Sequence, residues 1–229
     1  MMQARDRLIV AADLSSADEI RRLAAELRDA AGAIKIGLQA FVANGPGLVR
    51  DIVAAGHRVF LDLKLHDIPN TVQHAVHEAE TLGAAMLTVH AAGGEAMLRA
   101  ARSETTLVLA VTILTSLSDQ ELWQVGFHGR AAENAVRLAT LAQQAGIRGV
   151  VASPLEIEAI REACGAEMTI VTPGIRSAGA AEGDQRRTLT PAGAIRAGAD
   201  AIVVGRPITG AANRRDAALR IVEEMERAG

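Results

Sequence analysis

The sequence lacks the features that mark disulfide-stabilised, membrane-spanning and nucleic-acid-binding proteins. Its 229 residues include a single cysteine, Cys164, which excludes an intrachain disulfide and suits a reducing compartment. No apolar run approaches the roughly 20 residues needed to cross a bilayer, and the chain starts without the apolar region of a signal peptide. The formal net charge of −3 gives no general attraction to nucleic acid or to an anionic membrane. We therefore expect a cytoplasmic protein that binds neither.

Short apolar runs recur along the chain, and each has the length of a buried β-strand. The composition, 49% hydrophobic and 22% charged, suits a well-filled core. No Pro/Ser-rich linker or shift in composition divides the sequence, so we expect one domain over residues 1–229. The eight candidate strands are Leu8–Leu14, Ala33–Leu38, Val59–Leu65, Met86–Ala91, Leu107–Leu114, Gly149–Ser153, Met168–Ile175 and Ala201–Ile208.

Segments between these runs have helical periodicity, as in Ala17–Ala31 and Asn134–Ala145. The pairs Ser153-Pro154 and Thr190-Pro191 are typical of an N-cap followed by a first-turn proline. Several glycines fall shortly before a strand, where a left-handed helix cap is expected. They are Gly32, Gly56, Gly83, Gly146, Gly165 and Gly198.

Eight strands alternating with helices predict an α/β fold of the (β/α)8 TIM-barrel type, in a single domain. A doubly wound open sheet is the alternative, although such sheets more often use five to seven strands. In a barrel, the active site lies at the C-terminal ends of the strands.

Ionisable residues occupy several of those strand ends. Asp62 and Lys64 share one face of a strand whose other face is leucine, since side chains alternate along a strand. Lys35 lies within the second strand, Asp13 ends the first, and Asp67 begins the loop after the third. Buried charges cost several kcal/mol each unless they compensate one another. Acids and lysines in such a row hold one another ionised, and the row predicts a catalytic site.

The last two strands indicate an anion site. Barrel phosphate sites are commonly built from the loops after strands seven and eight. Thr172–Arg176 ends the seventh strand and Val203–Pro207 the eighth. Gly205 would let backbone N–H groups approach a phosphate, and Arg206 could bind its oxygens in a fork. The polar stretch Ser177–Arg187 is a candidate lid.

No metal site is predicted. His66, His74 and His77 lie close together in the sequence, but they match neither H-E-x-x-H nor the usual zinc spacings. Cys164 has no base partner nearby in the sequence and is interpreted as packing.

With these residues assembled, the chain resembles the orotidine 5′-monophosphate decarboxylases of the bacterial type. The ten-residue block Asp62–Thr71 is the most specific match, followed by Thr172–Arg176 and Gly183–Arg187. The other matching pieces, in chain order over almost the whole sequence, are Ala12-Asp13, Lys35–Gly37, Val111–Ser116 and Val204–Pro207.

The resemblance implies a role for each matching residue. Lys35, Asp62, Lys64 and Asp67 would form the catalytic charge array, with Lys64 giving the proton to C6 of the pyrimidine and Asp62 facing the departing carboxylate. The other matching residues would contact the ribose, the base and the phosphate of the nucleotide. Asp13 and Lys35 would contact the ribose, Thr115 and Ser116 the base, and Gln185, Gly205 and Arg206 the phosphate, with Arg176 nearby and with Ile68 and Pro173 also against the substrate.

The resemblance also implies a homodimer, because Asp67 and Thr71 would complete the site of the neighbouring subunit. No cofactor and no metal would be needed. Two alternatives remain at this point. Sugar-phosphate decarboxylases and hexulose-phosphate synthases share the Asp-x-Lys-x-x-Asp strand and use a divalent metal. A silent phosphate-binding barrel is also compatible with the fold, since fold does not determine function.

Overall fold

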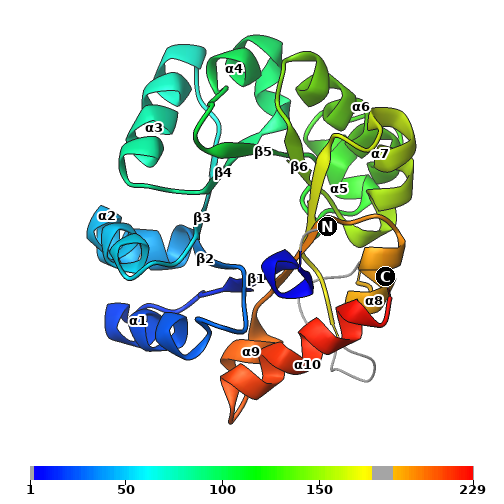
Figure 1. Cartoon of the computed structure of the whole chain (residues 1–229). Coiled ribbons are helices and arrows are strands. Elements are labelled where there is room, and N and C mark those ends of the chain that lie inside the picture. Colours follow the sequence, from blue (N-terminus) through cyan, green and yellow to red (C-terminus); the bar gives the residue numbers. More distant parts are fainter. Residues whose placement is uncertain (1–2, 177–187, 229) are drawn as a thin grey trace.

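The computed structural model describes residues 3–176 and 188–228 and shows a closed barrel of eight parallel strands. Each strand pairs with its neighbours in chain order, and β1 closes the ring by pairing with β8 (Figure 1). The strands are β1 (Leu8–Ala11), β2 (Ala33–Gly37), β3 (Val59–Leu65), β4 (Met86–His90), β5 (Leu107–Val111), β6 (Gly149–Val151), β7 (Thr169–Thr172) and β8 (Ala201–Val204). The predicted TIM barrel is confirmed, and the open sheet is excluded.

Helices surround the barrel and connect consecutive strands (Figure 1). The α-helices are α1 (Ala17–Glu26), α2 (Leu38–Ala54), α3 (Pro69–Thr81), α4 (Gly94–Ala100), α5 (Asp119–Gln124), α6 (Ala131–Gln144), α7 (Ile157–Cys164), α8 (Pro191–Arg196), α9 (Arg206–Thr209) and α10 (Arg214–Glu226). Three short 3₁₀ turns accompany them, η1 (Ala4–Arg7), η2 (Ala91–Gly93) and η3 (Pro154–Glu156). No helix among the described residues is long and apolar enough to cross a membrane.

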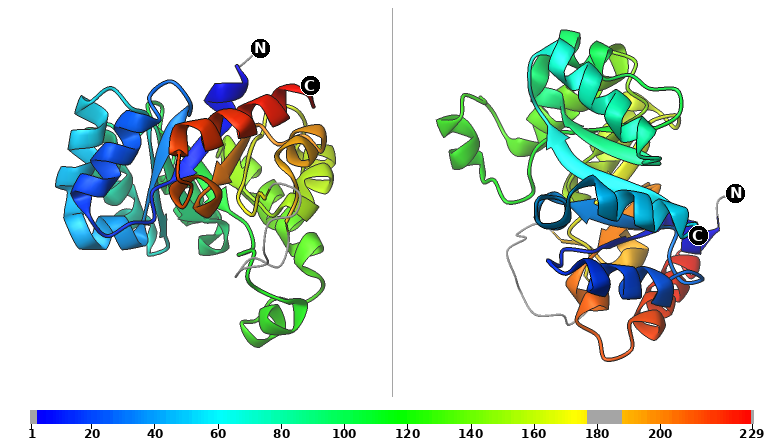
Figure 2. Two further views of the ribbon diagram at one scale, coloured as in Figure 1. Left: turned by 90° about the horizontal axis from the view of Figure 1, so that it is seen from below. Right: turned by 90° about the vertical axis from the view of Figure 1, so that its left-hand side faces the viewer.

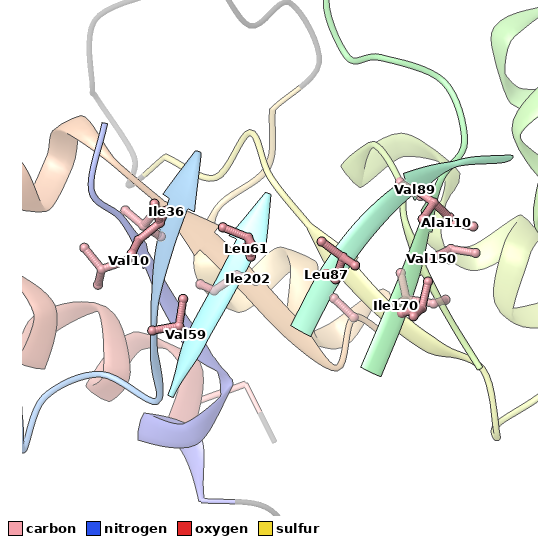
Figure 3. Packing of buried hydrophobic residues seen from close by; sticks show 14 of the residues in the cluster. Val10, Ile36, Val59, Leu61, Leu87, Val89, Ala110, Val150, Ile170 and Ile202 are labelled. Carbon is pink, nitrogen blue, oxygen red and sulfur yellow. The ribbon is translucent and has the colours of Figure 1, made fainter. Parts of the chain in front are cut away.

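Alternation along the strands produces two separate apolar layers. Residues such as Val10, Ile36 and Leu61 belong to the large outer core, which they share with buried residues of the helices (Figure 3). The intervening residues fill the inside of the barrel. That inner cluster consists of Ile9, Ala11, Ala33, Phe60, Met86, Leu109, Val171, Ala201 and Val203.

Several predicted strands end earlier than their apolar runs suggest. β1, β5, β7 and β8 stop three or four residues before the predicted ends at Leu14, Leu114, Ile175 and Ile208. Beyond the strand ends a few bonds to neighbouring strands continue, such as those from the N–H groups of Ala12 and Thr112, and many of the residues there line the cavity described below. Their apolar character therefore reflects burial in the barrel mouth rather than pairing within the sheet.

The predicted helix signals were largely confirmed. Ser153 and Thr190 accept hydrogen bonds at the starts of η3 and α8, each followed by proline at the first position. Five of the six predicted cap glycines have positive φ, namely Gly56, Gly83, Gly146, Gly165 and Gly198.

Gly32 is the exception, and the prediction of a left-handed cap there was wrong. Its φ lies outside the left-handed region. A Cβ at Gly32 would come within 2.4 Å of the backbone oxygen of Asp6, while the Gly32 N–H donates to the Leu8 carbonyl at 2.9 Å. The glycine is needed because the backbone of η1 passes directly against it.

The two ends of the barrel differ. The segments nearest the two chain ends, η1 and the end of α10, lie together at one end (Figure 2). At the opposite end, the segment between β5 and α6 that carries α5 projects from the body of the molecule (Figure 2). That opposite end is where the strands' C-termini open.

Candidate active site

A cavity of about 310 Å³ opens at the C-terminal ends of the strands. It is lined from all sides of the ring except β4. Its apolar walls come from residues such as Phe60, Val111 and Val203, which continue the inner cluster of the barrel. Apolar walls that surround a few placed polar groups are the usual form of a small-molecule site.

Four charged side chains form a continuous row along one wall of this cavity. Lys35 Nζ donates to Asp13 Oδ1 at 2.9 Å and lies 3.5 Å from Asp62 Oδ2. Lys64 Nζ donates to Asp62 Oδ1 at 2.8 Å. The order is therefore Asp13, Lys35, Asp62 and Lys64, with the sign alternating at every step. Three neighbouring strands, β1 to β3, bring these groups together.

The middle of this charged row is buried. Lys35 and Asp62 are 8% and 9% exposed, whereas Asp13 lies at the exposed end. Burial alone would raise the pKa of Asp62, but the nearby ammonium groups of Lys35 and Lys64 outweigh it and hold that pKa below its ordinary value. Asp62 therefore carries its negative charge at neutral pH.

Lys64 has an unusual backbone. Its φ of 52° makes it the one non-glycine residue with positive φ among residues 3–176 and 188–228. Left-handed geometry costs an ordinary L-residue about 1–2 kcal/mol, and such strain gathers at functional sites. The prediction that Lys64 continues the regular alternation of β3 was therefore wrong in detail. The pairing of β3 with β4 is irregular between Leu61 and Leu65.

The lysine's side chain nevertheless reaches the cavity. Lys64 lines it beside Asp62, as the charged pattern predicted. The irregularity changes the backbone conformation from which the Lys64 side chain extends into the cavity.

The far side of the cavity carries two arginines. β7 and β8 lie across the ring from β3, and the residues after them include Pro173, Arg176, Gly205 and Arg206, all of which line the cavity. The charges of the Asp13–Lys64 row sum to zero, and these guanidinium groups add positively charged side chains on the other side of the cavity. That asymmetry suits a ligand with an anionic group at one end.

The remaining predicted residues are distributed differently. Thr115, after β5, lines the cavity, whereas the adjacent Ser116 is exposed and does not. Asp67, Ile68 and Thr71 are also exposed, at the start of α3, outside the cavity of their own chain. Gln185 and the candidate lid Ser177–Arg187 lie outside the described residues.

Sequence reasoning missed Thr88, on β4. It is 0% exposed, and its hydroxyl contacts both Asp62 Oδ1 at 2.9 Å and the Lys64 backbone N at 2.8 Å. Alternation from Met86 would have placed Thr88 inside the barrel, but a threonine in a strand is too common to attract notice.

His90 ends the same strand, and its ring centroid lies 5.6 Å from that of His66. Burial lowers the pKa of His90, and the electrostatic interactions with His66 and Lys64 lower it further, against an opposing effect of Asp62. Among the described residues, no three His, Cys, Asp or Glu side chains gather as a metal site.

Comparison with known proteins agrees with this geometry. Residues 6–221 match the family model described as Orotidine 5'-phosphate decarboxylase / HUMPS family. The chain belongs to this family. The match covers every strand of the barrel and all the charged residues of the Asp13–Lys64 row.

Relatives within the family are similar over nearly their whole length. The chain is 50% identical to the orotidine 5'-phosphate decarboxylase of Heliobacterium modesticaldum, covering 98% of this chain and 97% of the relative. It is 49% identical to that of Moorella thermoacetica, covering 98% and 94%. A crystal structure of orotidine 5'-phosphate decarboxylase from Lactobacillus acidophilus superposes with a TM-score of 0.85 at 36% identity, covering 95% of this chain and 98% of that one.

Proposed function

We propose that the chain, acting as one catalytic domain over residues 1–229, converts orotidine 5′-monophosphate to uridine 5′-monophosphate and carbon dioxide. This is the last step of de novo UMP synthesis. The observation that carries the proposal is the Asp13–Lys35–Asp62–Lys64 row at the wall of the cavity. Identity of about 50% to curated decarboxylases over nearly full length supports it.

The reaction assigns opposite tasks to Asp62 and Lys64. The bond between C6 of the pyrimidine and its carboxylate breaks, and the electron pair stays on C6. The Lys64 ammonium gives a proton to C6, and carbon dioxide leaves. Asp62 faces the substrate carboxylate, whose negative charge disappears as carbon dioxide forms. The charges are in place before the reaction, so the protein has little reorganisation to undergo in the transition state.

The other end of the nucleotide binds across the barrel. Arg206, Gly205 and Gln185 hold the phosphate with Arg176 nearby, while Asp13 and Lys35 hold the ribose. Thr115 and Pro173 contact the pyrimidine from the cavity wall, and Ser116, which is exposed beside Thr115, would have to turn inward to reach it. Binding energy from the phosphate then offsets the cost of placing the substrate carboxylate close to Asp62.

We propose further that the active form is a homodimer in which Asp67, Ile68 and Thr71 enter the partner's site. Their exposure at the mouth supports this assignment, since none of them lines the cavity of its own chain. Ile68 is 66% exposed, and the large apolar side chains Leu38 and Val42, on the neighbouring α2, are exposed as well. Covering these groups would remove apolar surface from water.

The deciding experiment is the ultraviolet absorbance change when the protein is mixed with orotidine 5′-monophosphate, with and without a metal chelator. We expect conversion to uridine 5′-monophosphate at the same rate in both samples, because the proposed steps use only side chains. Conversion that is lost to the chelator would mean that the decarboxylation needs a metal and would contradict the proposed steps. No conversion in either sample would contradict the proposal.

A further inference from the structure

Thr88 occupies a position where two strands lose their register. Leu61 pairs with Leu87 and Leu65 pairs with Val89. Three residues of β3, Asp62 to Lys64, therefore stand opposite the single residue Thr88 of β4. Such bulges redirect side chains and are common beside active sites.

The Thr88 hydroxyl bonds to one backbone group and one side chain within this irregular stretch of β3. The Lys64 backbone N–H, which can only donate, lies 2.8 Å from Thr88 Oγ1. The hydroxyl must accept that bond, so its own proton is available for Asp62 Oδ1 at 2.9 Å. The direction of both hydrogen bonds is thereby determined.

A closed ring of contacts results. Asp62 Oδ1 also accepts from Lys64 Nζ at 2.8 Å. One hydroxyl thus holds the backbone of Lys64 in its left-handed conformation and orients the carboxylate that the same lysine's ammonium contacts. Because Thr88 is 0% exposed, no water can take its place without a rearrangement of the barrel interior.

We propose that Thr88 is a positioning residue for the Asp62–Lys64 pair, acting on the reaction through those two groups without touching the substrate. This inference rests on the proposed function for the role of Lys64. It concerns the geometry from which the proton is delivered and leaves the phosphate end of the cavity unaffected. Removing the hydroxyl should therefore change kcat much more than the affinity for nucleotide.

The test compares Thr88→Val, which removes the hydroxyl at similar volume, with Thr88→Ser, which keeps it. We expect Thr88→Val to lower kcat by about 10- to 100-fold, the effect of losing a hydrogen bond to a charged group. The KM and the Kd for uridine 5′-monophosphate should change by less than about threefold, as for a group that acts only in the transition state. Thr88→Ser should recover most of the wild-type kcat.

Thr106→Val is the matched control. Thr106 is another buried threonine, 2% exposed, and it lies directly before the start of β5. Its hydroxyl donates to the Ala84 carbonyl at 2.8 Å. It should lose stability in the same way while keeping the wild-type kcat. Equal kcat values for Thr88→Val and Thr106→Val, or a Thr88→Ser variant as slow as Thr88→Val, would overturn the inference.

Two further measurements cover the other outcomes. If Thr88→Val does not fold, Thr88→Cys replaces it, because a thiol is a weak donor and acceptor, and the same fall in kcat is expected. A crystal structure of the folded variant should show Lys64 Nζ displaced from Asp62, and an unchanged Lys64 would overturn the inference. Because this readout needs no turnover, it decides whether Thr88 positions Lys64 even if the wild type is inactive, an outcome that would contradict only the proposed function.

Discussion

At the scale of single residues, a few buried charges carry a large desolvation cost. Lys35 and Asp62 are removed from water, and each is compensated by a neighbour of opposite sign within 3.5 Å. An array of this kind contributes little net stability. Its value lies in a field that is already oriented when the substrate arrives.

Lys64→Ala tests the proton donor. We expect kcat to fall on the order of 10²- to 10⁴-fold or more, the range for removing a general acid. Binding of uridine 5′-monophosphate, measured by calorimetry, should remain largely intact because the phosphate end of the cavity is unchanged. Substantial decarboxylation by this variant would assign the proton to another group.

The pKa of Asp62 predicts a pH dependence of stability. A carboxyl whose pKa is lowered by folding contributes stability that is present above its ordinary pKa, about 4, and lost as the pH falls through the lower folded value. Urea unfolding of the wild type should therefore show a steeper loss of unfolding free energy below about pH 4 than Asp62→Asn does. The variant should be less stable at pH 7, where Lys35 and Lys64 lose their shared partner. Parallel curves for the two proteins would show that Asp62 is not held ionised by its neighbours.

At the scale of strands and helices, the site depends on where regular structure stops. The sequence was sufficient to predict the barrel and the inward direction of Lys35 and Asp62, because both follow from apolar periodicity. It could not reveal the left-handed Lys64, since the irregularity is a property of the β3–β4 pair. Thr88 was missed for the same reason: its importance depends on what stands opposite.

Gly32 illustrates the same limit, because spacing along the chain suggested a cap while the structure shows a close approach of η1. We expect Gly32→Ala to lower the unfolding free energy by about 3 kcal/mol, at the upper end of the cost of overpacking, since the obstructing atom belongs to the Asp6 backbone.

Gly165→Ala is the control for Gly32. Gly165 has a φ of 76°, and nothing lies within 4 Å of an added Cβ. It should cost only the conformational strain of about 1–2 kcal/mol. Urea unfolding of both variants makes the comparison. A larger loss for Gly165→Ala would mean that η1 moves aside easily.

At the scale of the whole molecule, not every predicted site residue lies at the cavity of its own chain. The cavity is lined by the Asp13–Lys64 row and by Arg176 and Arg206, while Asp67 remains exposed outside it. The family match over residues 6–221 and the closed barrel do not by themselves determine the number of subunits. The number of subunits depends on the contact surfaces of the chain, where the structure shows a few exposed apolar residues such as Leu38, Val42 and Ile68.

Mixing two inactive variants tests the proposed shared site. In a dimer of one Lys64→Ala and one Asp67→Ala subunit, one site has both defects and the other has neither. Random exchange between equal amounts should restore about a quarter of the wild-type activity, because half of the dimers carry one intact site of two. Each variant incubated alone is the control. Activity that stays at the level of the separate variants would place Asp67 in its own subunit's site or outside catalysis.

The projecting segment that carries α5 has a spectroscopic consequence. Trp123, 66% exposed in α5, is the single tryptophan of a chain that contains no tyrosine. Its ring meets that of His128 edge-on, with centroids 5.6 Å apart. The same segment begins with Ile113, Leu114 and Thr115, which line the cavity. The intrinsic fluorescence of this protein therefore comes from one indole, in the same segment as three residues of the cavity wall. A change in its emission on adding a nucleotide reports on this segment alone.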